Sequence, residues 1–153
     1  MKSILKKLLF VTVILVISFS CSKNETTDPY SAIENEILQL VNSHRTSMGL
    51  SSLAMNDVIY TECKNHSTDM GNTDSMNHNG SNIRFSNIAT KFGGTAFAEN
   101  VAYGQTSASQ VVTDWLNSAG HKANIEGNYN YTGISVVKNS KGINYFTQIF
   151  VKK

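Results

Sequence analysis

Hydrophobic residues recur at helical spacing in four segments of this chain and alternate only near its end. The first helix is predicted to begin at a Ser31–Glu34 capping box and to stop at Gly49. The second follows the capping residue Asn56 and ends at Gly71. The third is short and is broken by the pair at 93–94. The predicted buried face carries Ile33, Ile37, Leu40, Val41 and His44 in the first helix, and one face of the second carries Val58, Ile59, Cys63, His66 and Met70. Ile83, Phe85 and Ile88 indicate the short third helix.

The most regular helical pattern runs from Thr106 to Ala119. It begins at a Ser107–Gln110 capping box and presents one apolar face, formed by Ala108, Val111, Val112, Trp115 and Leu116. Gly120 suits the left-handed residue that closes a helix, so His121 is expected to leave the helix at a fixed point. His121 either caps the helix, because a cation is favoured near a helix C-terminus, or has a functional role. Spacing alone leaves both interpretations open.

The last part of the chain is predicted to be β. Residues 97–102 form an extended segment, residues 131–137 a strand, and residues 143–151 a last strand after a turn at 139–142. Large apolar groups occupy both faces of the last strand, which indicates that it is covered on both sides. The predicted fold class is α+β, a three-layer α-β-α sandwich with a C-terminal antiparallel hairpin.

The first thirty residues are predicted to be an export and anchoring segment. A basic start with three lysines precedes the apolar run Leu8 to Phe19, which is the length of a signal-peptide core. Ser18-Phe19-Ser20-Cys21 looks like a bacterial lipobox, with Cys21 as the lipidated residue; an ordinary secretory signal with an incidental cysteine is the alternative. The predicted domains are a signal peptide (1–20), a lipidated cysteine with a polar tether (21–30), and one folded domain (31–153).

Removal of that leader changes the charge and cysteine arguments. The whole chain has a formal net charge of +2, and loss of three lysines leaves a mature charge of −1. No basic patch indicates nucleic-acid binding. With Cys21 lipidated, Cys63 has no partner for an intramolecular disulfide, so the folded domain must be stabilised by its core.

Three residues stand out as candidate chemistry. His78 lies in a polar loop, Glu99 interrupts an apolar segment, and His121 follows the glycine described above. A buried carboxylate is costly unless it is paired or coordinated, and two histidines with a carboxylate are the residue types of a metal site or an acid–base set. His44 is interpreted as packing, and His66 as either a core histidine or a cleft wall.

An ordered series of motifs resembles the CAP superfamily of cysteine-rich secretory proteins, antigen 5 and pathogenesis-related 1 proteins, in its short bacterial form. The resemblance covers about residues 33–150. It is carried by Asn42-x-x-Arg45, Gly49-Leu50-x-x-Leu53, His66-Ser67-x-Asp69-Met70, His78-Asn79-Gly80, Ala98-Glu99-Asn100-Val101-Ala102-x-Gly104, Trp115-x-x-Ser118-x-Gly120-His121-x-x-Asn124-Ile125, Gly133-Ile134 and Tyr145-Phe146-Thr147-Gln148-Ile149-Phe150.

The resemblance implies an α-β-α sandwich whose cleft is lined by two histidines and two acidic residues that sometimes hold zinc. His78, Glu99 and His121 match three of these positions, and Ser118 stands where the second acidic residue is expected. The candidate cleft set is therefore His78, Glu99, Ser118 and His121. A possible zinc site would use His78, His121 and Glu99.

The leading hypothesis is a non-enzymatic binding module on the bacterial cell envelope, anchored to the membrane through Cys21, whose cleft takes a lipid, glycan or metal ligand. The alternative is a metal-assisted hydrolase of peptide or cell-wall material, with Glu99 as ligand or general base. A third hypothesis gives these side chains a purely structural role. A cysteine hydrolase using Cys63 and His66 is disfavoured, because an apolar neighbourhood raises the pKa of a thiol. The oligomeric state is left open.

Overall fold

A computed structural model describes residues 30–153; the predicted leader and Cys21 lie outside the described residues. The described part contains helices α1 (Ala32–Ser47), α2 (Asp57–Thr73), α3 (Ser81–Lys91), α4 (Ala108–Asn117) and α5 (Ala119–Ile125). Its strands are β1 (Ala54–Met55), β2 (Ala96–Tyr103), β3 (Tyr131–Lys138) and β4 (Asn144–Lys152). None of the helices in 30–153 is long and apolar enough to cross a membrane.

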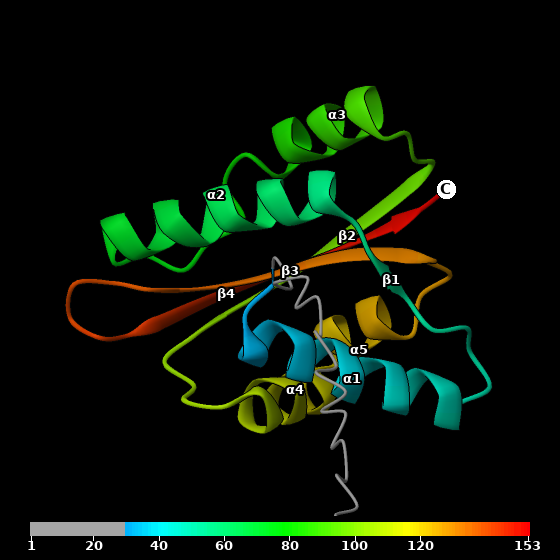
Figure 1. Ribbon diagram of the computed structural model, residues 1–153, viewed down its shortest axis with the longest axis horizontal. Helices are drawn as coiled ribbons and strands as arrows, with labels where there is room; N and C mark the ends of the chain where they lie inside the picture. The colour runs from blue at the N-terminus through cyan, green and yellow to red at the C-terminus, as the bar shows by residue number, and fades with distance from the viewer. Residues whose placement is uncertain (1–29) are drawn as a thin grey trace, which may run out of the picture.

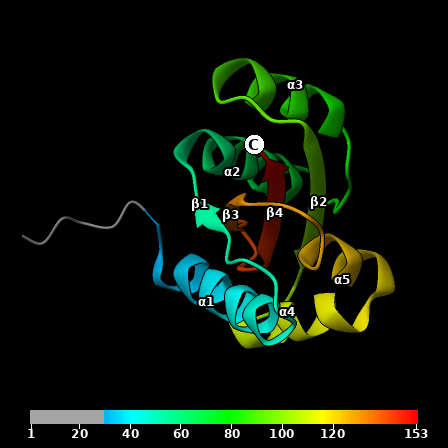
Figure 2. The same cartoon turned by 90° about the vertical axis from the view of Figure 1, so that its right-hand side faces the viewer.

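The sheet lies between two helical layers. Its strand order is β1-β3-β4-β2, with β4 antiparallel to both β2 and β3 and the short β1 parallel to β3. Figures 1 and 2 show α2 and α3 on one face of the sheet and α1, α4 and α5 on the other. The predicted α+β three-layer sandwich and its C-terminal hairpin are therefore confirmed.

The central strand explains this arrangement. In β4 every residue from Tyr145 to Val151 is buried, because neighbouring side chains point to opposite faces and both faces are covered. The larger core lies under α1, α4 and α5 and includes Ile37, Val41, Val111, Trp115, Ile134, Phe146 and Phe150. A second core under α2 and α3 includes Ile59, Cys63, Ile88, Ile149 and Val151.

Two predicted helix starts are confirmed in detail. The Ser31 hydroxyl accepts the Glu34 amide while Glu34 Oε2 accepts the Ser31 amide, a complete capping box. Asn56 Oδ1 accepts the amides of Val58 and Ile59 at the start of α2. Glu34 also reaches the sheet, because its Oε1 accepts the Val136 amide at 2.9 Å.

Two predicted helix ends are wrong. Helix α2 continues past Gly71 to Thr73 and is closed by Asp74 in the left-handed conformation, with φ 48°. The fourth helix ends at Asn117, because Ser118 has an extended backbone. Gly120 does not have a positive φ and lies inside the new helix α5, and His121 follows it within that helix. His121 is therefore presented from α5 rather than from the end of α4.

Buried Arg45 fixes the place of α5. From the end of α1 its guanidinium donates to the carbonyls of Ser51 and Ile125, at 2.9 and 2.6 Å, and to those of Gly127 and Tyr129, at 2.9 and 3.0 Å. These bonds join α1 to the segment between α5 and β3. The helix that carries His121 is thus held by a cation buried among backbone oxygens.

The close approach of α2 to β3 generates a stability prediction. A Cβ on Gly133 would lie 2.4 Å from the Tyr60 amide nitrogen and 2.5 Å from the Ile59 carbonyl carbon, and backbone atoms cannot move aside cheaply. We expect Gly133→Ala to lower the free energy of unfolding by about 3 kcal/mol. Gly120→Ala is the matched control: nothing lies near its Cβ position, so better helix propensity should raise stability by about 0.5 kcal/mol. Denaturant unfolding measures both, and equal effects would contradict the prediction.

Candidate functional site

The centre of the site is the buried carboxylate of Glu99 on β2. Its side chain is 3% exposed and is held by Arg84 of α3, whose Nε donates to Oε2 and whose Nη2 donates to Oε1, each at 2.7 Å. His78 Nδ1 lies 2.8 Å from Oε1. Because a carboxylate only accepts, His78 donates from Nδ1, and its other ring nitrogen Nε2 is left as the acceptor in the neutral ring.

The segment before α3 is fixed by two side chains. Arg84 Nη1 donates to the Asn79 carbonyl at 2.7 Å, and His66 Nε2 lies 2.8 Å from the Asn77 carbonyl, to which it donates. Asn77 closes the turn internally, since its Oδ1 accepts the Asn79 amide and its Nδ2 donates to the Ser75 carbonyl. Residues 75–79 thus form a braced wall between α2 and α3.

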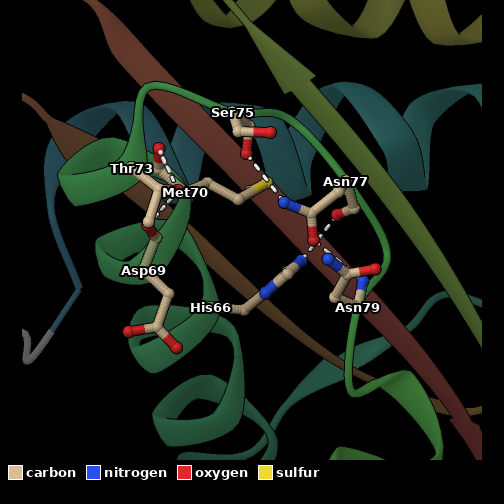
Figure 3. A pocket seen from close by; sticks show the side chains of 7 residues that line it. All are labelled: His66, Asp69, Met70, Thr73, Ser75, Asn77 and Asn79. Carbon is tan, nitrogen blue, oxygen red and sulfur yellow. Dashed lines mark hydrogen bonds between the residues drawn. The ribbon is translucent and has the colours of Figure 1, made fainter.

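Alternate residues of this wall face different cavities. Ser75, Asn77 and Asn79 line a polar cavity of about 300 Å³ against α2, which we call the α2 pocket. Figure 3 shows these side chains, with the His66 ring directed at Asn77. Met76 lines a second cavity, and His78 turns to Glu99. The α2 pocket is lined by His66, Asp69, Met70, Thr73, Ser75, Asn77 and Asn79.

The second cavity, which we call the Trp115 pocket, has a volume of about 250 Å³. It lies between β2, α4, α5 and the wall. Its lining residues are Met76, Val101, Ala102, Tyr103, Gln105, Asp114, Trp115, Ser118 and His121. Trp115 is buried, as predicted, and its Nε1 donates to the Val101 carbonyl at 3.3 Å.

Helix α5 is tied to β2 beside Glu99. Asn100 Nδ2 donates to the His121 carbonyl at 3.1 Å, and Asn124 Nδ2 donates to Asn100 Oδ1 and to the Glu99 carbonyl. Burial lowers the pKa of His121, and the electrostatic interaction with the nearby His78 ring lowers it further. His121 is therefore a neutral imidazole at pH 7.

The four predicted cleft residues divide into two pairs. His78 and Glu99 are in direct contact, and Ser118 and His121 line the Trp115 pocket together. Among residues 30–153 no group of three or more His, Cys, Asp or Glu side chains is arranged to hold a metal ion. Both oxygens of Glu99, the predicted third zinc ligand, already accept hydrogen bonds from Arg84.

Sequence reasoning missed Arg84. Ile83, Phe85 and Ile88 predicted this short helix, and within it Ile83 is exposed while Arg84 and Ile88 are buried. Arg84 and Ile88 stand four residues apart on the buried face, which is the one signal that the sequence offers. Its partner is fifteen residues away on another element, and no local pattern reveals that contact.

His44 and Cys63 line neither the α2 pocket nor the Trp115 pocket. His44 does not pack in the core as predicted: it is part-exposed, and its Nε2 lies 2.8 Å from Glu126 Oε1. Cys63 is fully buried, and its thiol donates to the Gly133 carbonyl at 3.2 Å. Burial raises the pKa of the Cys63 thiol well above its usual range, which disfavours a thiolate nucleophile.

Three comparisons bear on this fold and site. Residues 38–150 match the model of the cysteine-rich secretory protein family, CAP. The uncharacterized protein YkwD of Bacillus subtilis (strain 168) is 28% identical over 127 residues, which is 80% of this chain and 48% of YkwD. The chain therefore spans about half the length of that curated relative.

Two solved structures resemble the chain closely in fold. An outer surface protein from Borrelia burgdorferi has a TM-score of 0.70 at 20% sequence identity, and the alignment covers 78% of this chain and 91% of that protein. An extracellular protein containing a SCP domain from Bacillus anthracis str. Ames has a TM-score of 0.68 at 25% sequence identity, and the alignment covers 78% of this chain and 40% of that protein.

The buried His66 generates a prediction on pH. Burial lowers the pKa of His66, against a smaller opposite effect of its bond to Asn77. Below about pH 6.5 the unfolded chain therefore binds a proton at His66 more readily than the folded chain does. The free energy of unfolding is highest above that pH and falls as the pH drops through about 6 to 5. His66→Gln, whose amide can still donate to the Asn77 carbonyl, should reduce this fall.

Denaturant unfolding at pH 7, 6 and 5 tests the prediction. His121→Gln serves as the comparison, because burial also lowers the pKa of His121, and the double variant should reduce the fall further than either single change. An identical pH dependence in the wild type and in His66→Gln would contradict the assignment.

Proposed function

The chain belongs to the cysteine-rich secretory protein (CAP) family, and from this premise we propose that it is an extracytoplasmic binding module whose Trp115 pocket holds one end of an amphipathic ligand. The proposal rests on one observation above all: the pocket combines an apolar floor with a buried polar atom that has no partner. The solved relative from Bacillus anthracis is itself described as extracellular.

The apolar side of the pocket supports an amphiphile. Val101, Ala102 and Trp115 form its buried floor, and Met76 and Tyr103 stand at its rim with 45% and 54% of their surface exposed. Large hydrophobic side chains that remain exposed around a concavity are a feature of ligand sites. A hydrocarbon chain entering here would cover both rim residues.

The polar side of the pocket supports a hydroxyl group on that ligand. Gln105 donates from Nε2 to Asp114 Oδ2 at 2.9 Å, while its buried Oε1 has no hydrogen-bond partner in the described structure. A small turn of the Gln105 amide would expose this covered oxygen, and a ligand hydroxyl could then donate to it. The neutral imidazole of His121 adds a group that can donate or accept.

The size of the pocket limits the ligand. A volume of about 250 Å³ lies just below the range of known ligand cavities, which starts at roughly 300 Å³. The pocket therefore takes a short amphiphile or the hydroxylated end of a longer lipid. A saccharide fits the apolar floor poorly, which favours a lipid over a glycan.

Binding can be measured directly, because Trp115 is the only tryptophan of the chain and lines the pocket. We expect 1-decanol to change its fluorescence saturably and to bind more tightly than 1-methoxydecane, which lacks the hydroxyl donor. Met76→Ser should weaken 1-decanol binding about fivefold, since it removes roughly 1 kcal/mol of apolar contact.

Met48→Ser is the matched control for this experiment. Met48 is also an exposed methionine, at 58%, but it lies at the end of α1 and outside the pocket. The affinity of Met48→Ser for 1-decanol should therefore match that of the wild type. Saturable binding of N-acetylglucosamine without binding of 1-decanol would replace the lipid with a glycan. Equal losses in the two methionine variants would remove the pocket from the proposal.

We further propose that the domain is anchored to the membrane by lipid on Cys21, as the lipobox predicts. Cys21 lies outside the described residues, so this proposal rests on the sequence alone. Cys21→Ser expressed in a bacterial host should move the protein from the membrane fraction to the soluble fraction and abolish labelling by radioactive palmitate. Membrane association that survives the substitution would contradict lipid anchoring.

A further inference from the structure

The zinc set predicted from the family resemblance does not fit the donors in this chain. A catalytic zinc site has three protein ligands, and a structural site has four. His78 offers Nε2 and His121 offers its imidazole, but the carboxylate that would complete the set lies in the buried ion pair with Arg84. Two ligands remain where three are needed.

Arg84 is a difficult competitor for a metal to displace. The planar guanidinium contacts both oxygens of Glu99 through two nitrogens, and both side chains are buried, at 8% and 3% exposure. Its third nitrogen is engaged by the Asn79 carbonyl. A metal that took Glu99 would leave a buried cation without its counter-ion, and separating such a pair is strongly unfavourable.

Arg84 also opposes a metal by its charge. The guanidinium neutralises Glu99, so this ion pair offers an incoming dication no net negative charge. A cation bound between the two histidines would lie near the fixed positive charge of Arg84, in a site partly shielded from water. Geometry and charge therefore act in the same direction.

We propose that Arg84 is the residue that keeps this cleft free of tightly bound divalent metal, and that Glu99 acts as a positioning residue for the His78 ring rather than as a ligand. The ligand of the cleft is then recognised without a metal ion. The proposal shares its location with the proposed function, but it concerns only the donors around Glu99.

The test is a zinc titration of the chelator-treated protein against a competing chromophoric chelator. Arg84→Gln should free Glu99 to join His78 and His121, and zinc affinity should rise at least tenfold, by analogy with the roughly 10- to 100-fold effects of single changes around metal sites. Arg84→Gln with Glu99→Gln should return the affinity to that of the wild type. Adding His78→Ala to Arg84→Gln should also remove the gain.

Lys91→Gln is the matched control for charge. Lys91 ends the same helix, its side chain is 58% exposed, and it pairs with Glu62 at 3.7 Å rather than with Glu99. Its loss should change zinc affinity less than about twofold, as expected for an exposed charge. An equal gain in Lys91→Gln and Arg84→Gln would overturn the specific role of Arg84.

Two further outcomes would overturn the proposal. One is a wild-type protein that binds one zinc as tightly as Arg84→Gln does. The other is an Arg84→Gln variant that is folded, by circular dichroism, but shows no gain. If Arg84→Gln does not fold, Arg84→Lys takes its place: the ammonium keeps the charge but loses the two-point contact, so zinc affinity should rise at least threefold.

Two separate readouts distinguish this inference from the proposed function: binding of 1-decanol and binding of zinc. Binding of 1-decanol, followed by Trp115 fluorescence, does not involve the Glu99 carboxylate. If the wild type does not bind 1-decanol, the lipid proposal is contradicted and the zinc affinities still test the role of Arg84. If zinc affinity does not rise in Arg84→Gln, the role of Arg84 is contradicted and the decanol measurement still tests the lipid proposal.

Discussion

The arrangement of the candidate site depends on the ion pair between Glu99 and Arg84. Glu99 lies on β2 beneath α3, where a carboxylate without partners would be strongly unfavourable. A guanidinium satisfies it with two hydrogen bonds and uses its remaining nitrogen to hold the Asn79 carbonyl. One side chain thus fixes a strand, a helix and the wall at 75–79 relative to one another. The orientation of His78 follows from that pair, because its ring donates to the same carboxylate.

Two other buried charges connect distant parts of the chain in the same way. Glu34 caps α1 and accepts the Val136 amide of β3, and Arg45 donates to four carbonyls that lie between 51 and 129 in the sequence. Within residues 30–153 the single cysteine is free and buried, so no disulfide makes these connections in the described domain. Charged side chains with several backbone partners provide them instead. Since each charge is satisfied by groups from different elements, the tertiary arrangement is specified by polar contacts as well as by the core.

The sequence predicted what depends on local chemistry. The capping residues Ser31 and Asn56, the fully covered strand at 143–151 and the three-layer order all follow from patterns that extend over a few residues. It failed where tertiary contacts decide. Gly120 is the residue type that typically ends a helix, yet the break comes two residues earlier at Ser118. Asn100 and Arg45 hold the following turn as a separate helix. The sequence did not single out Arg84, because its partner Glu99 is on another element. His78 and Glu99, which the sequence grouped together, are in direct contact, but their relation to Arg84 could not be read from spacing.

The wall at 75–79 shows why the identity of one buried partner matters for function. Its alternate side chains separate two different environments: asparagines and a serine face the polar α2 pocket, while Met76 faces the apolar Trp115 pocket and His78 faces Glu99. The wall keeps this alternation because His66 holds it from one side and Arg84 from the other. Both anchors bind backbone carbonyls, so their hold on the wall does not depend on the side chains of Met76 and His78. The chemistry offered to a ligand can therefore change at Met76 or His78 while the frame is preserved. Whether a metal takes part then depends on Glu99, and Glu99 is controlled from α3, a helix that carries none of the predicted zinc ligands.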